Sequence, residues 1–320
     1  RRRLRRALAG RARSGGTIPR LPLPSRLPVQ TRPLGRSGLA CAPLAFGGNV
    51  FGWTADEATS FRLLDEFVDA GFSLVDTADV YSEWVEGHTG GESETIIGHW
   101  LAKSGKRDRV LIATKAGFTG REEGKLTREH ILKCCDESLR RLRTDVIDLY
   151  QSHREDPATP HEETLGAYAD LIRAGKVRAI GCSNFRPATL RAALDCSKAH
   201  GLPRYETLQP LYNLHDRADF EAQLRDLCLA EEIGVIPFFA LAAGFLTGKY
   251  RADADVALSA RGSRAKTHMT ERGFRIIAVL EAVAAHLHAT PGQVAVAWLM
   301  TRPAVAAPIA SGRTVEQVRD

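Results

Sequence analysis

The chain has 320 residues, of which 44% are hydrophobic and 26% charged, a balance that is ordinary for a soluble globular protein and large enough to bury a sizeable core. Its formal net charge of +6 comes from the first 32 residues, which hold ten arginines and no acid; the rest, at +6 less ten, carries −4 and is not expected to bind nucleic acid. No apolar run is long enough to predict a membrane span, and six cysteines without a C-x-x-C motif are expected to be reduced thiols in a cytoplasmic protein.

The N-terminal segment, residues 1–31, mixes Arg with Gly, Pro, Ser and Leu and shows no apolar periodicity. We therefore expect a disordered basic extension, followed by one folded domain over residues 32–320. Three origins of the extension stay open: a reading-frame artefact, since residue 1 is not Met; an organelle transit peptide; and a basic arm for an acidic partner.

From Leu34 onward, short apolar strands alternate with amphipathic helices, after a hairpin arm at 39–46. Continuous apolar strands separated by helices predict a parallel sheet that is covered on its faces. No G-x-G-x-x-G follows the first strand, and eight such units favour an α/β fold of the (β/α)8 TIM-barrel type with a short N-terminal β-hairpin. The expected strands are Leu44–Gly47, Phe72–Asp76, Val110–Thr114, Val146–Gln151, Val177–Cys182, Glu206–Leu211, Gly234–Phe238 and Ala304–Ile309.

Helix boundaries are also marked in the sequence. Thr54 followed by Glu57 is expected to be a capping box, and Gly71 is expected to end the helix that follows. Further helices are expected from Thr127, over Glu162–Ala174 and over Thr290–Thr301.

Polar side chains stand at the ends of three successive expected strands. Asp76 ends the second strand and Tyr81 follows five residues later; Lys115 ends the third and His153 the fourth. In a barrel these ends converge on one face. Reduction of a carbonyl group needs a proton donor, and a tyrosine acts as one at neutral pH only if a nearby cation favours its phenolate. We expect Lys115 to supply that charge, Asp76 to hold Lys115, and His153 to orient the carbonyl.

Each of these four residues also has an ordinary explanation. Asp76 reads equally as a helix cap, Tyr81 as a packing ring, Lys115 as a solvated charge and His153 as a buried imidazole; their joint order favours chemistry. A lyase that forms a Schiff base on Lys115 stays open. No metal site is expected, because the histidines lack close ligand spacing and H-E-x-x-H is absent.

Several longer motifs resemble the aldo-keto reductase family, especially its bacterial-type branch related to potassium-channel β-subunits. They are Asp76-Thr-Ala-Asp-Val-Tyr81, Gly90-Gly-Glu-Ser-Glu94, Leu149-Tyr-Gln-Ser-His153, Gln209-Pro-Leu-Tyr-Asn213 and the segments 175–185 and 244–250. The resemblance extends over residues 31–320. It implies an NADP(H)-dependent oxidoreductase that acts on the CH–OH group of donors and reduces a small aldehyde or ketone, with Tyr81 as general acid, Lys115 and Asp76 as its tuning partners and His153 orienting the substrate.

The same resemblance implies a set of cofactor-binding residues: Ser183, Asn184 and Gln209 at the nicotinamide carboxamide, Phe238 stacked on the nicotinamide ring, Ser311 and Arg313 at the adenosine 2′-phosphate, and Gln317 near the adenine. Without it, Ser183 and Asn184 read as a helix N-cap before Pro187, Phe238 as a strand aromatic and Arg313 as a solvated surface residue.

Other questions stay open in the sequence. Trp53 is expected to be a wall of the substrate pocket, or an exposed loop anchor. Compared with the family, the domain is expected to be C-terminally truncated at Asp320. A regulatory subunit that senses the nicotinamide cofactor with little turnover is the alternative function, and the substrate, stereochemistry and oligomeric state are not predicted.

Overall fold

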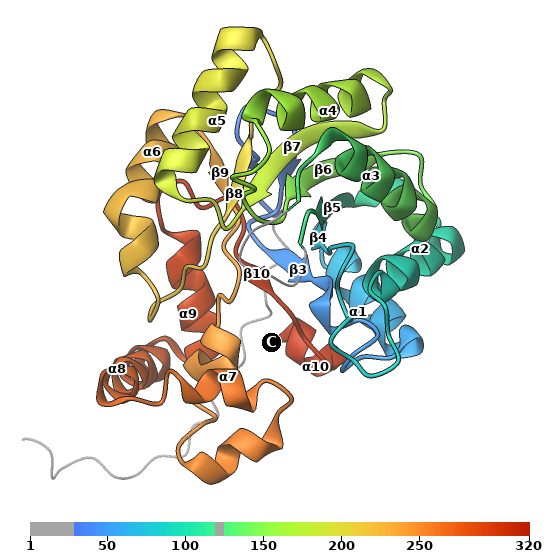
Figure 1. Cartoon of the computed structure of the whole chain (residues 1–320). Helices are drawn as coiled ribbons and strands as arrows, with labels where there is room; N and C mark the ends of the chain where they lie inside the picture. Colours follow the sequence, from blue (N-terminus) through green and yellow to red (C-terminus); the bar gives the residue numbers. More distant parts are fainter. Residues whose placement is uncertain (1–28, 119–124) are drawn as a thin grey trace, which may run out of the picture.

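A closed sheet of eight parallel strands forms the centre of the molecule, which a computed structural model describes over residues 29–118 and 125–320 (Figure 1). At one edge of the sheet Ile309 pairs in parallel with Ala45. At the other edge, Val235 N donates to Ala304 O and Val235 O accepts from Ala306 N, each at 2.8 Å, which closes the barrel. In sheet order the strands are β10 (Ile309–Ala310), β3 (Ala45–Gly47), β4 (Leu74–Asp76), β5 (Leu111–Ala116), β6 (Ile147–Ser152), β7 (Val177–Ser183), β8 (Thr207–Gln209) and β9 (Gly234–Val235). The predicted (β/α)8 architecture is thereby confirmed.

Five strands are shorter than predicted, and in three of them, β8, β9 and β10, proline explains the difference. Pro210, Pro237 and Pro308 have no N–H to give to a ladder, so the regular pairing stops beside them. Beyond β8 and β9, the pairing resumes as a single bridge between Leu211 and Phe238.

Helices connect the strands and cover the outside of the barrel, as Figure 1 shows. A large apolar core lies between the strands and these helices. The helices are α1 (Glu57–Asp69), α2 (Glu92–Ser104), α3 (Arg128–Leu142), α4 (His161–Arg173), α5 (Pro187–His200), α6 (Arg225–Ala230), α7 (Gly262–Lys266), α8 (Glu271–Leu287), α9 (Pro291–Met300) and α10 (Val315–Arg319). Shorter turns are the 3₁₀ segments η1 (Gly48–Val50), η2 (Arg107–Arg109), η4 (Ala242–Thr247) and η5 (Asp253–Leu258), and the π-helical turn η3 (Phe220–Leu224).

The start of α1 corrects one prediction. The N-cap is Asp56, whose carboxylate accepts from Thr59 N at 2.8 Å, so the capping box expected at Thr54 is wrong. Thr54 lies instead in the preceding turn, where its N–H is bonded to Val50 O. The carboxylate two residues further on is the better acceptor for the free N–H groups of the first turn. Gly71 follows the helix with φ +95°, as predicted.

An N-terminal hairpin closes one end of the barrel. Its strands, β1 (Arg32–Pro33) and β2 (Ala40–Cys41), pair antiparallel. Leu34, Leu39 and Cys41 are buried in a second core inside the barrel, among the inward-facing side chains of the strands. A Cβ on Gly234, the first residue of β9, would lie 2.8 Å from Gly35 N. The hairpin therefore seals the end where the strands begin, and leaves the opposite end for a site.

The buried carboxylate of Asp148 links neighbouring segments of the barrel. Asp148 in β6, whose side chain is 2% exposed, accepts from Arg107 Nη2 at 2.8 Å, from Arg178 Nη1 at 2.7 Å and from the backbone N–H of Ile112 at 2.8 Å. Because the contacts come from three different segments, this one side chain cross-links the start of β5 to β6 and β7.

The expectation for the basic extension falls largely on residues 1–28, which lie outside the described residues. Over the part of the chain that the structure does describe, none of the helices combines the length and apolar character needed to cross a membrane. All six cysteines are free thiols, as expected.

Candidate active site

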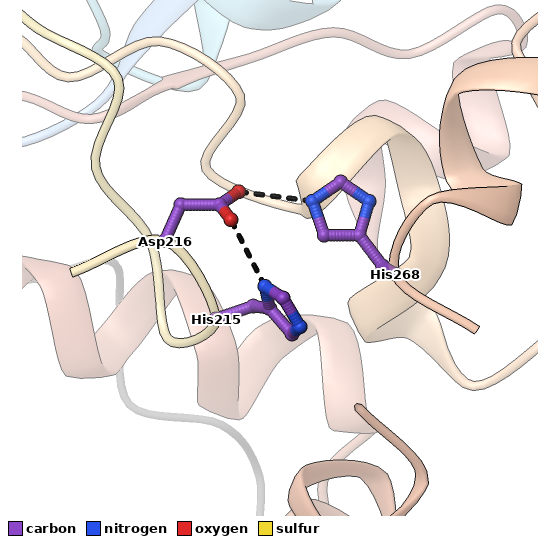
Figure 2. A group of neighbouring side chains, drawn as sticks. All are labelled: His215, Asp216 and His268. Carbon is purple, nitrogen blue, oxygen red and sulfur yellow. Dashed lines mark hydrogen bonds and ion pairs between the residues drawn. The ribbon is translucent and has the colours of Figure 1, made fainter. Parts of the chain in front are cut away.

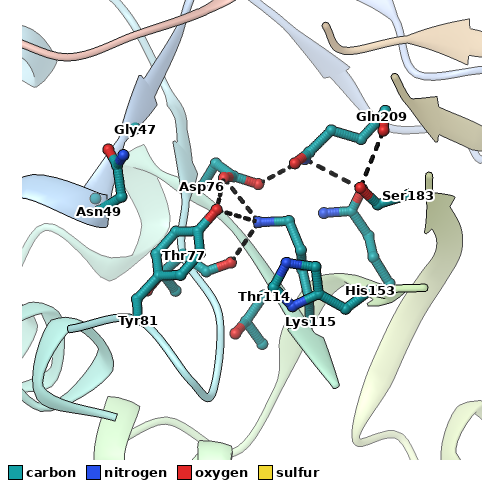
Figure 3. Close-up of polar contacts among 12 residues, drawn as sticks. Gly47, Asn49, Asp76, Thr77, Tyr81, Thr114, Lys115, His153, Ser183 and Gln209 are labelled. Carbon is teal, nitrogen blue, oxygen red and sulfur yellow. Dashed lines mark hydrogen bonds and ion pairs between the residues drawn. The ribbon is translucent and has the colours of Figure 1, made fainter. Parts of the chain in front are cut away.

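Asp76, Tyr81 and Lys115 meet at the end of the barrel where the strands finish (Figure 3). Lys115 Nζ donates to Asp76 Oδ2 at 2.8 Å, to Thr77 O at 2.8 Å and to the Tyr81 hydroxyl oxygen at 3.0 Å. These three bonds use all three ammonium protons. The lysine side chain has no exposed surface, so its charge is neutralised inside the protein by Asp76.

The chain positions these groups from adjacent strands and one turn. Asp76 ends β4, and Lys115 lies near the end of β5. Tyr81 comes back over the barrel through the turn after β4, in which Tyr81 N donates to Ala78 O. Ser82 has φ +78°, and its hydroxyl donates to Phe51 O at 2.6 Å, which fixes the turn to the loop after β3.

Burial and charge act in opposite directions on this group. Burial lowers the pKa of Lys115, but Asp76 and Tyr81 together outweigh it and leave that pKa raised, so the lysine stays cationic. Burial raises the pKa of Tyr81; Lys115 opposes this, yet the pKa stays above the ordinary value. The sequence predicts that the Lys115 cation lowers the pKa of Tyr81, but it does not predict that burial raises this pKa. Tyr81 is therefore a protonated donor at neutral pH.

His153 stands beside Tyr81, with the two ring centroids 6.1 Å apart. Its backbone N–H donates to Ala116 O at 2.8 Å, which continues the pairing of β5 and β6. Burial, with the charges of Lys115 and Arg154, holds the pKa of the imidazole well below its usual value, so the ring is neutral. Its Nδ1 is buried and makes no hydrogen bond with any described residue. A buried nitrogen without a hydrogen-bond partner is available to bond to a ligand.

Ser183, Asn184 and Gln209 lie together next to this group. Asn184, with φ +58°, donates through Nδ2 to His153 O at 3.2 Å and to Ser183 Oγ at 2.9 Å. Ser183 Oγ donates to Gln209 O at 3.0 Å, and Gln209 Nε2 donates to Asp76 Oδ1 at 2.8 Å. The alternative of a helix cap is wrong, because α5 has Arg186 as its N-cap and no side-chain capping bond. The bonds join the three polar side chains to the Tyr–Lys–Asp group.

The loop after β10 reaches the same end of the barrel. Ser311 Oγ donates to Gly47 O at 2.8 Å. A Cβ on Gly47 would lie only 2.6 Å from Ser311 Oγ. Arg313 is half-buried, and its N–H donates to Gln317 Oε1 at 2.8 Å. Gln317 itself is exposed on α10.

Aromatic side chains line the approach to Tyr81. Trp84 lies edge-on to both Tyr81 and Trp53, at 6.0 and 5.7 Å between ring centroids. Trp53 is half-buried. Phe238 is half-buried beyond β9, with its ring 5.2 Å from that of Phe239.

One site residue was missed in the sequence. The guanidinium of Arg261 lies 5.5 Å from the centre of the Trp53 ring, and its Nη2 is buried with no hydrogen-bond partner in the described chain. Burial lowers the pKa of Arg261, and the nearby cations Arg264 and Arg313 lower it further. Three arginines therefore gather at one side of the site. The segment that carries Arg261 has no periodicity from which its position could be predicted.

A half-buried acid, Asp79, lies behind the site. Asp79 N donates to Lys115 O at 3.2 Å, while its Oδ1 is buried and unpartnered among the described residues. Burial, with the charge of Glu94, raises the pKa of Asp79 to about 7. Glu94 is better compensated, since it accepts from Thr114 Oγ1 and from Arg141 Nε.

A closed parallel barrel with buried polar groups at the carboxyl ends of its strands defines the class of (β/α)8-barrel enzymes. Within that class the chain belongs to the aldo-keto reductase family: the model described as "Aldo/keto reductase family" matches residues 43–320. The family consists of oxidoreductases that act on carbonyl compounds, in general with nicotinamide cofactors.

Similar proteins come from bacteria and plants. The chain is 34% identical to "Uncharacterized oxidoreductase YrpG" of Bacillus subtilis, over 90% of this chain and 88% of that protein. It is 32% identical to "Protein tas" of Escherichia coli, over 91% of each chain. It is 31% identical to "Probable voltage-gated potassium channel subunit beta" of Oryza sativa, over 91% of this chain and 89% of that protein.

Proposed function

We propose that this protein reduces an aldehyde or ketone to an alcohol with NADPH, and that Tyr81 delivers the proton. The observation that carries the proposal is the hydrogen bond of the buried Lys115 ammonium to the Tyr81 hydroxyl, beside an imidazole that lacks a partner. A phenol in contact with a fixed cation is a suitable proton donor to a developing alkoxide, because the cation stabilises the phenolate that remains. The reduced nicotinamide cofactor supplies the hydride when it is bound.

The proton transfer follows from the geometry. The substrate oxygen takes the proton from the Tyr81 hydroxyl, and the O–H electron pair stays on the phenol oxygen. Lys115 Nζ, 3.0 Å away, then holds the phenolate, while Asp76 keeps Lys115 in place. His153 is neutral and has one N–H to donate, so we assign it the task of orienting the carbonyl oxygen.

The residues present fit a nicotinamide dinucleotide phosphate. Asn184 donates its amide N–H groups to His153 O and Ser183 Oγ. Its Oδ1 is therefore left to accept a hydrogen bond from the nicotinamide carboxamide. We place Ser183 and Gln209 with it at the nicotinamide, and Phe238 against the ring face. At the other end, Arg261 has a buried N–H without a partner, as an anion-binding group requires.

We assign Arg313, Ser311 and Gln317 to the adenosine end of the cofactor. Arg313 stands where a loop leaves the last strand of the barrel, a usual position for phosphate binding in this fold. The nearby charge of Arg261 favours a phosphorylated ribose over a plain one. This is the support for NADP(H) over NAD(H).

Two alternatives fare differently. A Schiff base on Lys115 needs a neutral amine, but the pKa of Lys115 is raised and its three protons are engaged, so we do not propose a lyase. A regulatory subunit that senses the cofactor is our second candidate, supported by the 31% identity to a probable potassium-channel β-subunit.

Two further points belong to the proposal. We take residues 32–320 as the catalytic domain and 1–31 as an extension of it. We assign the protein to the cytoplasm, a reducing compartment, on the support of six cysteines that are all free thiols.

A steady-state assay of NADPH oxidation over a panel of aldehydes and ketones tests the function. Turnover that needs both the carbonyl compound and NADPH supports the reductase. Tight NADPH binding with no turnover over the whole panel would favour the regulatory alternative.

A further inference from the structure

In the loops that follow β8 and α7, two histidines and an aspartate form a compact group (Figure 2). Asp216 Oδ1 lies 2.9 Å from His215 Nδ1, and Asp216 Oδ2 lies 2.9 Å from His268 Nε2. One ligand atom from each residue lies within 4.8 Å of the others. His268 is 52 residues from Asp216 along the chain, so spacing in the sequence gives no sign of the group.

We propose that His215, Asp216 and His268 form a binding site for one divalent transition-metal ion of the zinc type. Two imidazoles and one carboxylate are a ligand set that suits zinc, with a water molecule as the fourth ligand. Zinc bonds to imidazole nitrogen at about 2.0–2.1 Å and to carboxylate oxygen at about 2.0–2.2 Å, so ligand atoms in a tetrahedral site lie a little over 3 Å apart. The observed separations reach this spacing by small rotations of the side chains.

The state of His268 supports a cation at this point. Its Nδ1 lies 3.3 Å from Thr267 Oγ1, and that hydroxyl donates its own proton to Arg264 O at 2.8 Å. The Thr267 oxygen can therefore accept from His268 Nδ1–H, and in that tautomer the lone pair of Nε2 faces the carboxylate of Asp216. Two electron-rich atoms 2.9 Å apart need a proton or a metal ion between them. A metal-bound histidine usually donates its second ring N–H in this way.

The carboxylate of Asp216 is held in position. Asn213 Nδ2 donates to Asp216 Oδ2 at 3.0 Å. Asn213 Oδ1 also accepts from the backbone N–H groups of His215 and Asp216, at 2.8 and 2.9 Å. Two of the three ligands are thus already held in place before any ion binds.

Over the described residues, a further charged group bonded here is Arg272 of α8, which donates to His215 O at 2.9 Å. Its side chain is exposed, so water screens its repulsion of a bound cation. With neutral imidazoles the three ligands carry one negative charge, which favours a divalent ion.

The proposed ion has a structural effect. His215 and Asp216 lie in the loop after β8, while His268 lies between α7 and α8. A bound metal ion would therefore connect the end of the segment that carries Arg261 to the loop after β8. The proposal concerns binding alone and does not depend on the reaction proposed above.

Calorimetric titration of the untagged, EDTA-treated full chain with zinc chloride tests the proposal. We expect one zinc ion per chain, and at least about 100-fold weaker binding in His268→Gln and in His215→Gln, because even an outer partner of a metal ligand is worth about 10–100-fold. Thr267→Ala should weaken zinc by about 10-fold. Cobalt should give the visible absorption of a four-coordinate site in the wild type and lose it in both histidine variants.

A matched control is His99→Gln, which removes an imidazole that is bonded to a single carboxylate, Glu57, at 2.7 Å. It should bind zinc like the wild type. Circular dichroism establishes that each variant is folded; if one histidine variant fails to fold, the other decides the question. The proposal is overturned if the wild type binds no zinc beyond what both histidine variants bind, which would mean that the group is hydrogen-bonded only.

Discussion

Lys115 Nζ donates a hydrogen bond to the Tyr81 hydroxyl at 3.0 Å and also lies 4.7 Å from the centre of the tyrosine ring. The two residues come from consecutive βα units at the carboxyl end of the barrel, where Lys115 is buried and Tyr81 half-buried. The contact couples the charge of one side chain to the acidity of the other, and the first two predictions depend on it.

Tyr81→Phe should reduce the turnover of aldehyde by about 10²–10⁴-fold, the usual contribution of a positioned proton donor. The affinity for NADPH should stay near that of the wild type, because the ring remains. Steady-state kinetics and fluorescence titration measure the two effects. Tyr150→Phe, at a buried tyrosine of β6 whose hydroxyl makes only a 3.4 Å contact with Ile131 O, is the matched control. A Tyr81→Phe enzyme of normal turnover would remove Tyr81 from the mechanism.

Lys115→Met should move the pH dependence of alcohol oxidation to higher pH. The oxidation direction needs the phenolate of Tyr81, and Lys115 lowers the pKa of that phenol, so the pKa rises when the cation is lost. The rate should fall as well. A pH–rate profile of alcohol oxidation measures both, and a melting curve shows whether the variant, with Asp76 left unpaired, is still folded. A folded variant whose profile keeps its shape and position contradicts the assignment.

Arg313→Ala should weaken NADPH by about ten-fold or more and leave NADH nearly unchanged. A hydrogen bond to a charged group contributes about 1.5–3 kcal/mol, and about 1.4 kcal/mol is a factor of ten. Fluorescence titration of both nucleotides with both proteins gives the ratio. The exposed Arg173→Ala on α4 is the control. An equal loss for both nucleotides would assign Arg313 to folding or to the adenine instead.

Asp148→Ala should destabilise the fold by about 3 kcal/mol, the low end of the range for breaking a buried ion pair. The low end applies because Arg107 and Arg178 both reach water, whereas the N–H of Ile112 loses its acceptor inside the protein. Chemical denaturation measures the free energy of unfolding. Asp195→Ala, at an exposed position on α5, should change it by less than about 0.5 kcal/mol.

Asp79→Asn should change how stability depends on pH. The pKa of Asp79 is raised to about 7 in the fold, above its ordinary value near 3.8, so the neutral carboxyl stabilises the fold at acid pH and this stability is lost as the pH rises through 7. Asparagine stays neutral. The melting temperature of the variant relative to the wild type should therefore rise from pH 5 to pH 8. A difference that stays constant over that range, as expected for the exposed control Asp108→Asn, would contradict this role of Asp79.

Strand order and the positions of Asp76, Lys115 and His153 could be predicted because apolar runs and strand-end polar residues are local patterns. Other features depend on contacts between residues far apart in the sequence, which local patterns do not predict. Arg261 enters the site from a segment without periodicity, and His268 meets Asp216 across 52 residues. The cap of α1 was misplaced because Thr54 and Asp56 are both good caps, and only the preceding turn decides between them.

The hairpin that seals the barrel imposes an order on folding. Arg32 donates to Met300 O and Val305 O, partners that lie 268 and 273 residues later in the chain. Arg32 therefore leaves the ribosome long before either of its two partners. These contacts of the seal form by one of the longest loop closures open to this chain, which makes them a late event and a slow one. A nascent chain arrested before α9 would lack β10 and the partners of Arg32, so neither the barrel nor its seal could close.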